Sequence, residues 1–196
     1  MKVIGVTGTS GVGKTTVCEI LNKKFNAFII DADEVARELS KKGNMYLQAI
    51  AECFGQDILD NDGNLKRKEL ASLIYNDKVK REALNSITFK YVVEEIKRRL
   101  DLAKENELIV IDAALLFESK LNEVCDIVLG IIADEARKIE RICKRDIITE
   151  EMAKKRIAVQ ITDKELLKKA DYAIKNTGDI QILEKDITIL YGKISK

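Results

Sequence analysis

Apolar residues gather along the chain in short continuous runs, separated by longer stretches in which they recur at helical spacing. A continuous apolar run bounded by glycine or aspartate is typical of a strand buried on both faces of a parallel sheet. Strands of this kind that alternate with helices predict an α/β fold, with helices on both faces of a parallel sheet. The runs lie at residues 3–6, 28–30, 108–111, 127–132 and 172–174.

The intervening stretches predict helices and one long insertion. A highly charged helical region spans about residues 34–105 and is broken at Gly43-Asn44 and at the turn-forming residues 60–64. This region is expected to be an insertion between the second and third strands. Thr149 is a suitable N-cap for one of the later helices. The other helices are expected at residues 14–25, 138–145, 149–160 and 180–194.

The charge balance narrows the class of partner. The chain has 196 residues, with 34 basic and 33 acidic side chains and a formal net charge of +1. A surface that binds nucleic acid or an anionic membrane would need a lopsided excess of basic residues, so neither partner is expected. No stretch reaches the ~20 apolar residues that span a bilayer, and the N-terminus does not resemble a signal peptide. We therefore expect a cytoplasmic protein. None of these features indicates an oligomeric state.

Histidine and cysteine usage excludes several kinds of chemistry. The chain has no histidine, so imidazole metal sites and Ser-His or Cys-His nucleophiles are ruled out. Its four cysteines, Cys18, Cys53, Cys125 and Cys143, show no C-x-x-C spacing. They are expected to be reduced residues of the core.

The clearest chemical signal follows the first apolar run. Gly8-Thr9-Ser10-Gly11-Val12-Gly13-Lys14-Thr15 matches the pattern G-x-x-x-x-G-K-[ST] without a gap. Backbone N–H groups of such a loop surround phosphates, and the following helix adds its positive N-terminal dipole. Lys14 is expected to reach the β- and γ-phosphates of ATP, and the Thr15 hydroxyl to ligate Mg²⁺. The expected nucleotide-binding residues are Gly8, Ser10, Gly11, Val12, Gly13, Lys14, Thr15 and Thr16.

Three aspartates end predicted strands, where open α/β sheets bind ligands. Asp112 is expected to help hold Mg²⁺, directly or through water. Asp31 and Asp33 follow the second strand, and one of them could accept the proton of an attacking hydroxyl. A capping role for the helix that follows is the alternative, and the sequence leaves it open for Asp31.

Arginine residues form a stripe on one predicted helix. Arg137, Arg141 and Arg145 are spaced four apart and therefore share one helical face. Guanidinium groups stabilise the charge that develops during phosphoryl transfer, but a stripe of charges is also typical of a solvated face. Spacing alone does not decide between these interpretations.

Taken together, several segments resemble the dephospho-coenzyme A kinases along nearly the whole chain. Their order and spacing carry the resemblance, because each segment alone is a weak signal. Besides the phosphate loop, the matching runs lie at residues 30–33, 54–55, 62–67, 84–88, 112–118, 141–146, 156–160, 170–171 and 176–178.

The resemblance implies the architecture of the nucleoside-monophosphate kinases: a P-loop fold with a five-stranded parallel core, a helical substrate-binding insertion and a small lid. It implies transfer of the ATP γ-phosphate to the ribose 3′-hydroxyl of dephospho-coenzyme A, with Mg²⁺. The core is expected at residues 1–34, 106–133 and 170–196, the insertion at 35–105, and the lid at 134–169.

The same resemblance assigns roles to individual residues. It implies that Asp33 is the general base and that Arg141 and Arg145 are lid arginines around the phosphates, which act in catalysis together with Lys14. It places Asn176 in the adenine site. The residues that it implies for the substrate cleft are Thr7, Asp33, Arg67, Leu115 and Glu118.

The chain departs from the family at a few positions. Such kinases usually carry His-Pro where this chain has Phe89-Lys90, Pro in place of Ala114, and Gln in place of Lys138. The lost His-Pro keeps open a second hypothesis, a P-loop kinase of another small acceptor such as a nucleoside or nucleotide. A third hypothesis, a nucleotide-dependent switch, would require an Asn-Lys-x-Asp motif that recognises guanine, and Asn22-Lys23-Lys24 is followed by Phe25 instead.

Overall fold

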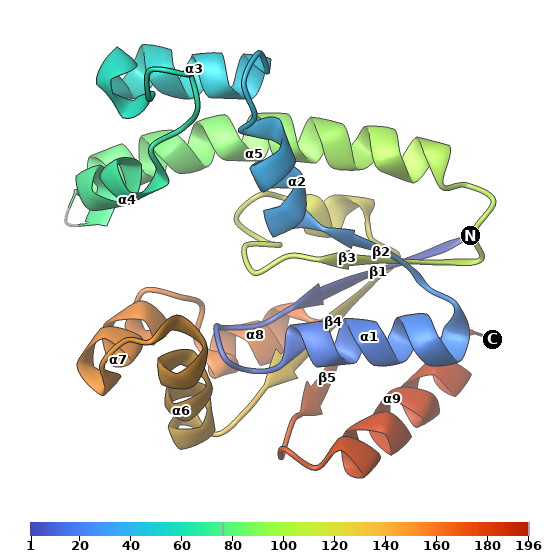
Figure 1. Ribbon diagram of the computed structural model, residues 1–196. Coiled ribbons are helices and arrows are strands. Elements are labelled where there is room, and N and C mark those ends of the chain that lie inside the picture. The colour runs from blue at the N-terminus through green and yellow to red at the C-terminus, as the bar shows by residue number, and fades with distance from the viewer. Residues whose placement is uncertain (76, 196) are drawn as a thin grey trace. The chain divides into compact units, whose positions relative to one another are not determined.

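The computed structural model describes residues 1–75 and 77–195, which form two compact units. The first unit comprises Met1–Ile30 and Ala103–Lys196, and the second comprises Asp31–Leu102. The finer division into core, insertion and lid expected from the sequence stays a prediction. Figure 1 shows the elements of both units in chain order.

A five-stranded sheet organises the first unit, with strand order β2-β3-β1-β4-β5 (Figure 1). The central strand β1 pairs in parallel with β3 and β4, and β4 pairs in parallel with β5. The predicted parallel sheet of five strands is therefore confirmed. The strands are β1 (Lys2–Thr7), β2 (Phe28–Asp31), β3 (Leu108–Asp112), β4 (Ile127–Ile132) and β5 (Tyr172–Lys175).

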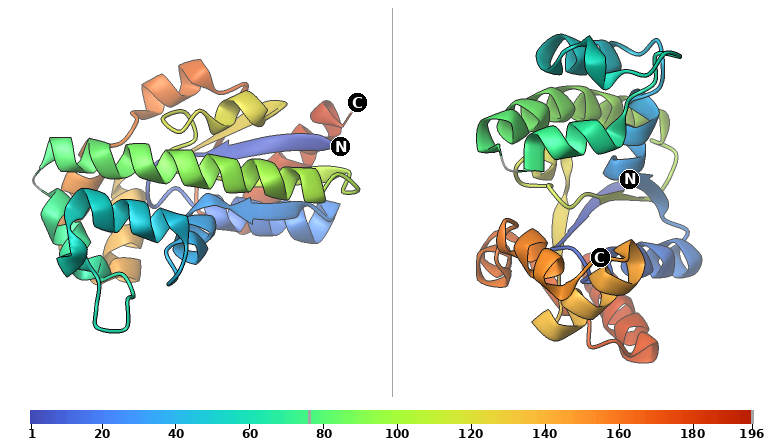
Figure 2. Two further views of the ribbon diagram at one scale, coloured as in Figure 1. Left: turned by 90° about the horizontal axis from the view of Figure 1, so that it is seen from above. Right: turned by 60° about the vertical axis from the view of Figure 1, so that its left-hand side comes forward.

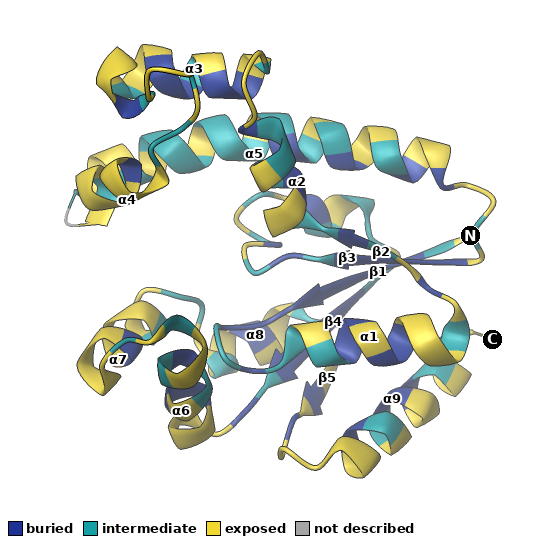
Figure 3. Ribbon diagram, in the orientation of Figure 1, coloured by how far each residue is buried: buried dark blue, intermediate teal, exposed yellow. Residues whose placement is uncertain are grey.

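Helices cover both faces of this sheet, as the apolar strands predict. On one face, α1 (Lys14–Phe25) and α9 (Ile180–Ile194) pack with Leu129 and Ile131 of β4 in one apolar core. Gly130 lies between these two residues and so faces the other side, where a Cβ would meet Leu166 of α8 (Asp163–Lys169) at 3.1 Å. Figure 3 shows α1 with a buried and an exposed side.

Two details of the first unit differ from the sequence-based expectation. Phe28 was expected in a fully buried strand, but it is 43% exposed because β2 is an edge strand of the sheet. The helix α8 was not predicted, although Thr162 and Glu165 form a capping box at its start. Thr-x-x-Glu is a local start signal that the apolar periodicity of so short a helix does not reveal.

Two further helices of the first unit, α6 (Glu135–Asp146) and α7 (Glu150–Ala158), pack on each other through Ile139, Ile142 and Ala153. The hydroxyl of Thr149 accepts a hydrogen bond from Met152 N and caps α7, as predicted. The helix α6 begins earlier than the expected residue 138: its first residue is Glu135, and Asp134 occupies the N-cap position.

The second unit is helical. Both predicted breaks are present: Asn44 caps a helix, and the Asp60 carboxylate accepts hydrogen bonds from the backbone N–H groups of Asp62 and Asn64. The last helix of this unit, Lys78–Leu102, is unbroken (Figure 2). Phe89 and Lys90 lie inside it, where a proline would disturb the helix. The elements are α2 (Ala32–Leu39), α3 (Met45–Phe54), η1 (Gln56–Ile58), α4 (Arg67–Tyr75) and α5 (Lys78–Leu102).

The cysteines form no disulfide among the described residues. Cys18 is buried, as expected, and Cys125 and Cys143 are partly buried. Cys53 is exposed, so its assignment to the core was wrong. It occupies the solvent side of α3, whereas Ile50 and Ala51 face inward. Within residues 1–75 and 77–195, no helix is both long and apolar enough to cross a membrane.

Candidate active site

The phosphate loop, residues 8–15, connects β1 to α1 and depends on glycine at defined points. Gly11 and Gly13 have φ values of 81° and 95°, a region that side chains rarely adopt. A Cβ on Gly13 would lie 2.4 Å from Asn176 Nδ2, and one on Gly11 would lie 2.5 Å from the Lys138 carbonyl oxygen. These glycines therefore allow both the backbone shape and the close packing of the loop.

The start of α1 is suited to an anion. Gly13 caps the helix without a side-chain hydrogen bond, and the first turn contains no acidic residue. The N–H groups and the positive end of the helix dipole can therefore meet phosphate oxygens. Lys14 Nζ lies 3.3 Å from the Gly8 carbonyl oxygen, so this ammonium stays over the loop, and Thr15 is exposed.

Asp112 lies beside the loop because of the sheet register. It ends β3 directly opposite Val6 of β1, one residue before Thr7. Thr7 is buried, and its hydroxyl lies 3.5 Å from the Ala114 carbonyl oxygen. The described residues contain no cluster of three carboxylate or cysteine side chains that would hold a metal alone. Mg²⁺ that arrives with a nucleotide needs fewer, because phosphates and water complete its coordination.

The segment after β3 presents two predicted substrate residues at the surface. Leu115 and Glu118 are exposed, while Leu116 between them is fully buried. An added Cβ on Gly5 of β1 would lie 2.9 Å from Leu116 Cδ2, which shows how closely the segment packs on the strand. The anchored Leu116 thus fixes the turn that carries the two exposed residues.

Of the arginine stripe, Arg141 reaches the phosphate loop itself. Its Nη1 donates hydrogen bonds to the carbonyl oxygens of Gly11 at 3.1 Å and Val12 at 3.2 Å. Asn176, which is buried, donates from Nδ2 to the same Val12 oxygen at 2.7 Å. The predicted lid arginine and adenine-site residue therefore lie together on one side of the loop.

Arg145 makes a different contact. Its guanidinium binds both carboxylate oxygens of Asp146, at 2.8 and 2.9 Å, and Arg156 of α7 binds the same carboxylate. The hydrogen bond from Arg145 lowers the pKa of Asp146 to about 2, and the one from Arg156 adds to the shift. Asp146, the last residue of α6, thereby holds the guanidinium of Arg145 from its own helix and that of Arg156 from α7.

In the second unit, Asp31 is the N-cap of α2. Its Oδ1 accepts hydrogen bonds from Asp33 N at 2.7 Å and Glu34 N at 3.0 Å. The open question about Asp31 is thus answered in favour of a capping role. Asp33 lies in the first turn of α2 and is exposed. Its predicted role as the base stays a prediction.

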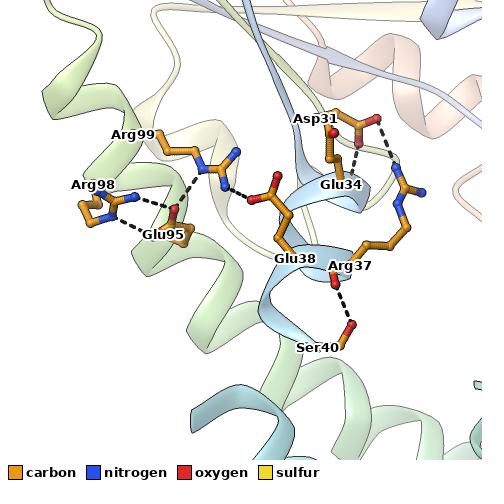
Figure 4. A network of polar contacts seen from close by, with 8 residues as sticks. All are labelled: Asp31, Glu34, Arg37, Glu38, Ser40, Glu95, Arg98 and Arg99. Atoms are coloured by element: carbon orange, nitrogen blue, oxygen red, sulfur yellow. Dashed lines mark hydrogen bonds and ion pairs between the residues drawn. The ribbon is translucent and has the colours of Figure 1, made fainter. Parts of the chain in front are cut away.

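Ion pairs hold α2 against α5 within this unit (Figure 4). Arg99 of α5 binds Glu38 of α2 and also Glu95, one turn earlier on its own helix. Arg98 donates two hydrogen bonds to Glu95, each at 2.8 Å. The hydrogen bond from Arg98 is the main cause that lowers the pKa of Glu95 to about 2. This network fixes the helix whose first turn carries Asp33.

A cavity of about 180 Å³ lies between α2, α3 and α4, and Arg67 is part of its wall. Arg67 Nη2 donates a hydrogen bond to Ser40 Oγ at 2.5 Å. Tyr46 also lines the cavity, and its hydroxyl is hydrogen-bonded to Thr88 Oγ1 at 2.9 Å. Burial raises the pKa of Tyr46 above its ordinary value. The wall is mostly apolar, with a few polar side chains.

Two contacts of the loop region were missed by sequence reasoning. The Ser10 N–H donates to Gln160 Oε1 at 2.9 Å, and Lys138 forms an ion pair with Asp163. Gln160 belongs to a run that resembles the family, residues 156–160, but its side-chain partner is far away along the chain. Lys138 stood out only as a departure from the usual Gln, and no sequence signal names its partner.

Comparisons with known proteins assign this chain to one family. A family model described as "CoaE: Dephospho-CoA kinase" matches residues 2–181. A dephospho-CoA kinase of Lactobacillus johnsonii is 37% identical over 195 residues, which cover 98% of each chain. One from Bacillus cereus is 39% identical over 180 residues, or 91% of this chain and 90% of the other.

Solved structures agree. A dephospho-CoA kinase from Campylobacter jejuni matches with a TM-score of 0.72 and 29% identity over 100% of this chain and 98% of the other. The Thermus thermophilus protein TT1252 reaches a TM-score of 0.81 at 24% identity over 98% and 97% of the two chains. The shikimate kinase of Acinetobacter baumannii, at 0.54 and 18% over 100% and 94%, shares the fold.

Proposed function

The chain belongs to the dephospho-CoA kinase family, and from that premise we propose which of its residues carry out the transfer. The protein is an ATP-dependent dephospho-CoA kinase of coenzyme A biosynthesis. It moves the γ-phosphate of ATP to the ribose 3′-hydroxyl of dephospho-CoA. The observation that carries this conclusion is the match to the family over residues 2–181, a range that includes an intact phosphate loop.

We assign nucleotide binding to the loop from Gly8 to Thr15 and to Thr16. The open N-terminus of α1 and the Lys14 ammonium over the loop support this assignment. Thr15 and Asp112 are our proposed protein ligands for the Mg²⁺ of the nucleotide, with water completing the shell at Asp112. Bound Mg²⁺ would neutralise charge on the phosphate oxygens. Two oxygen donors suit a metal that is held mainly by phosphates.

Arg141, Arg145 and Asn176 are assigned to the donor nucleotide. Contacts of Arg141 and Asn176 with the loop backbone support a place next to bound ATP. Guanidinium groups offer several N–H donors in one plane, which suits the spread charge of the transferred phosphoryl group. A closing lid that excludes water would protect ATP from wasteful hydrolysis.

Asp33 is our proposed general base for the acceptor hydroxyl, on the strength of the family resemblance and its exposed carboxylate. Thr7, Arg67, Leu115 and Glu118 are proposed to contact dephospho-CoA. The cavity next to Arg67 and the exposure of Leu115 and Glu118 support these assignments. No nucleic-acid or membrane partner is proposed, and we place the reaction in the cytoplasm.

A coupled assay of ADP release tests the function. Purified protein with ATP and Mg²⁺ is given dephospho-CoA, adenosine, AMP or no acceptor, and the product is identified by mass spectrometry. We expect ADP release only with dephospho-CoA, and a product that carries one additional phosphate. The Lys14→Ala variant should release no ADP. Faster turnover of adenosine or AMP would instead identify a kinase of another small acceptor.

A further inference from the structure

The connection between α7 and α8 contacts the phosphate loop through Gln160. The side-chain oxygen Oε1 of Gln160 accepts a hydrogen bond from the backbone N–H of Ser10, at 2.9 Å. The two residues are 150 positions apart in the sequence and belong to the same compact unit. Neither the phosphate-loop pattern nor the assigned roles explain this contact.

The other side-chain contacts of the loop act on its carbonyl groups. Arg141 and Asn176 donate hydrogen bonds to the carbonyl oxygens of Gly11 and Val12. Gln160 instead supplies an acceptor to an N–H group, and it does so nearer the start of the loop. The loop is thus held at two neighbouring points by groups of opposite polarity.

The residues that follow Gln160 are anchored to neighbouring elements. The buried Lys138 ammonium of α6 binds both carboxylate oxygens of Asp163, at 3.0 and 3.1 Å, at the start of α8. A capping box at Thr162 closes the same end of the helix, and Leu166 is fully buried against the sheet. The residues that follow Gln160 are therefore fixed to α6 and to β4, so its carboxamide is presented from a fixed position.

We propose that Gln160 is a positioning residue of the nucleotide site, which holds Ser10 and keeps the phosphate loop in its binding shape. A loop with glycine at three of its positions loses much conformational entropy when it is ordered around phosphates. A loop that is already ordered before ATP arrives binds ATP more tightly, because the ordering cost is removed from the binding step. The inference rests on the proposed ATP site and deepens it.

The test compares two substitutions that remove the acceptor. Gln160→Met keeps the length and most of the volume of the side chain, whereas Gln160→Ala removes both. Gln181→Met, at an exposed position in the first turn of α9, is the matched control. ATP affinity is measured by titration without any acceptor, together with the thermal unfolding midpoint of each variant.

We expect both Gln160 variants to bind ATP about threefold to tenfold more weakly, the range for one lost hydrogen bond. The KM for ATP should rise by the same factor, while kcat at saturating ATP and the KM for dephospho-CoA stay unchanged. The control should match the wild type. If Gln160 had only a structural role, its loss would lower the unfolding midpoint, but it would not raise the KM for ATP while leaving kcat unchanged.

Two outcomes overturn the inference. If Gln160→Met binds ATP as tightly as the wild type while Gln160→Ala does not, only packing at the site matters. If both bind normally, the contact has no role in nucleotide binding. These results are distinct from a failure of the proposed function, because ATP binding is measured without an acceptor. A wild-type protein that binds ATP but ignores dephospho-CoA would contradict the function and leave this test intact.

Discussion

The ammonium group of Lys138, on a side chain only 6% exposed, is paired with the carboxylate of Asp163, on a side chain that is 35% exposed. The pair joins α6 to the first turn of α8. The two charges differ in how far water can reach each one when the other is removed. Water can reach the carboxylate of Asp163 when Lys138 is replaced, but a lone Lys138 ammonium remains buried.

The two single substitutions at this pair should therefore differ in cost. Asp163→Ala leaves a buried charge without its partner and should reduce the free energy of unfolding by about 3 kcal/mol or more. Lys138→Met, which fills the same space with an apolar chain, should cost about 1 kcal/mol. Urea denaturation measures both. The double variant Lys138→Met/Asp163→Ala should be more stable than Asp163→Ala alone, and equal costs for the two single variants would contradict this account.

Asp33→Asn tests the proposed base. The substitution keeps the size of the side chain but removes its capacity to accept a proton, so kcat should fall about 10²- to 10⁴-fold. ATP affinity, measured by titration, should remain as in the wild type. Asp31→Asn is the matched control, because asparagine also caps helices and the capping oxygen is retained. Near-normal turnover of Asp33→Asn would remove the role from this residue.

Acid should destabilise the protein through two carboxylates that are paired with arginine. The pKa values of Glu95 and Asp146 are lowered to about 2 in the folded chain, below their ordinary values of about 4 in the unfolded chain. The unfolded state therefore binds more protons in between, and stability is lost as pH falls from about 5 towards 2. Glu95→Gln should flatten this dependence in urea denaturation measured across that range. An unchanged slope would show that Glu95 does not contribute.

Thiol reactivity should separate the cysteines. Cys53 is exposed, whereas burial raises the pKa of the Cys125 thiol to about 12, with the nearby carboxylates of Asp126 and Asp171 adding to the shift. Since the thiolate is the reactive form, iodoacetamide should modify Cys53 first and Cys125 slowly. Peptide mass spectrometry after brief treatment reads out both sites. Cys53→Ser should lose the first modification, and early labelling of Cys125 would contradict its burial.

Local signals in the sequence were sufficient for much of the fold. The limits of α1 and β4 follow from apolar spacing, and the structure places both helix and strand at the predicted residues. Such signals fail where burial depends on the neighbours of an element. Phe28 belongs to an apolar run, but the position of β2 at the sheet edge exposes it.

The candidate site was predictable only in part, for a related reason. Lys14 and Thr15 are identified by a contiguous pattern, because the chemistry of the loop is written within eight residues of sequence. The contact of Ser10 with Gln160 joins distant segments, and no periodicity or spacing encodes it. The pairing of Lys138 with Asp163 could not be predicted for the same reason. In the sequence, each residue looks like an ordinary surface charge.

The central position of β1 has a consequence for how the chain acquires activity during synthesis. Both strands that flank β1 come from residues beyond 107, and the side chains that hold the phosphate loop come from Arg141, Gln160 and Asn176. The nucleotide-binding loop is thus translated near the beginning but is completed only when the last third of the chain has left the ribosome. A nascent chain that stops before Arg141 carries the whole phosphate-binding motif and lacks all three of these contacts.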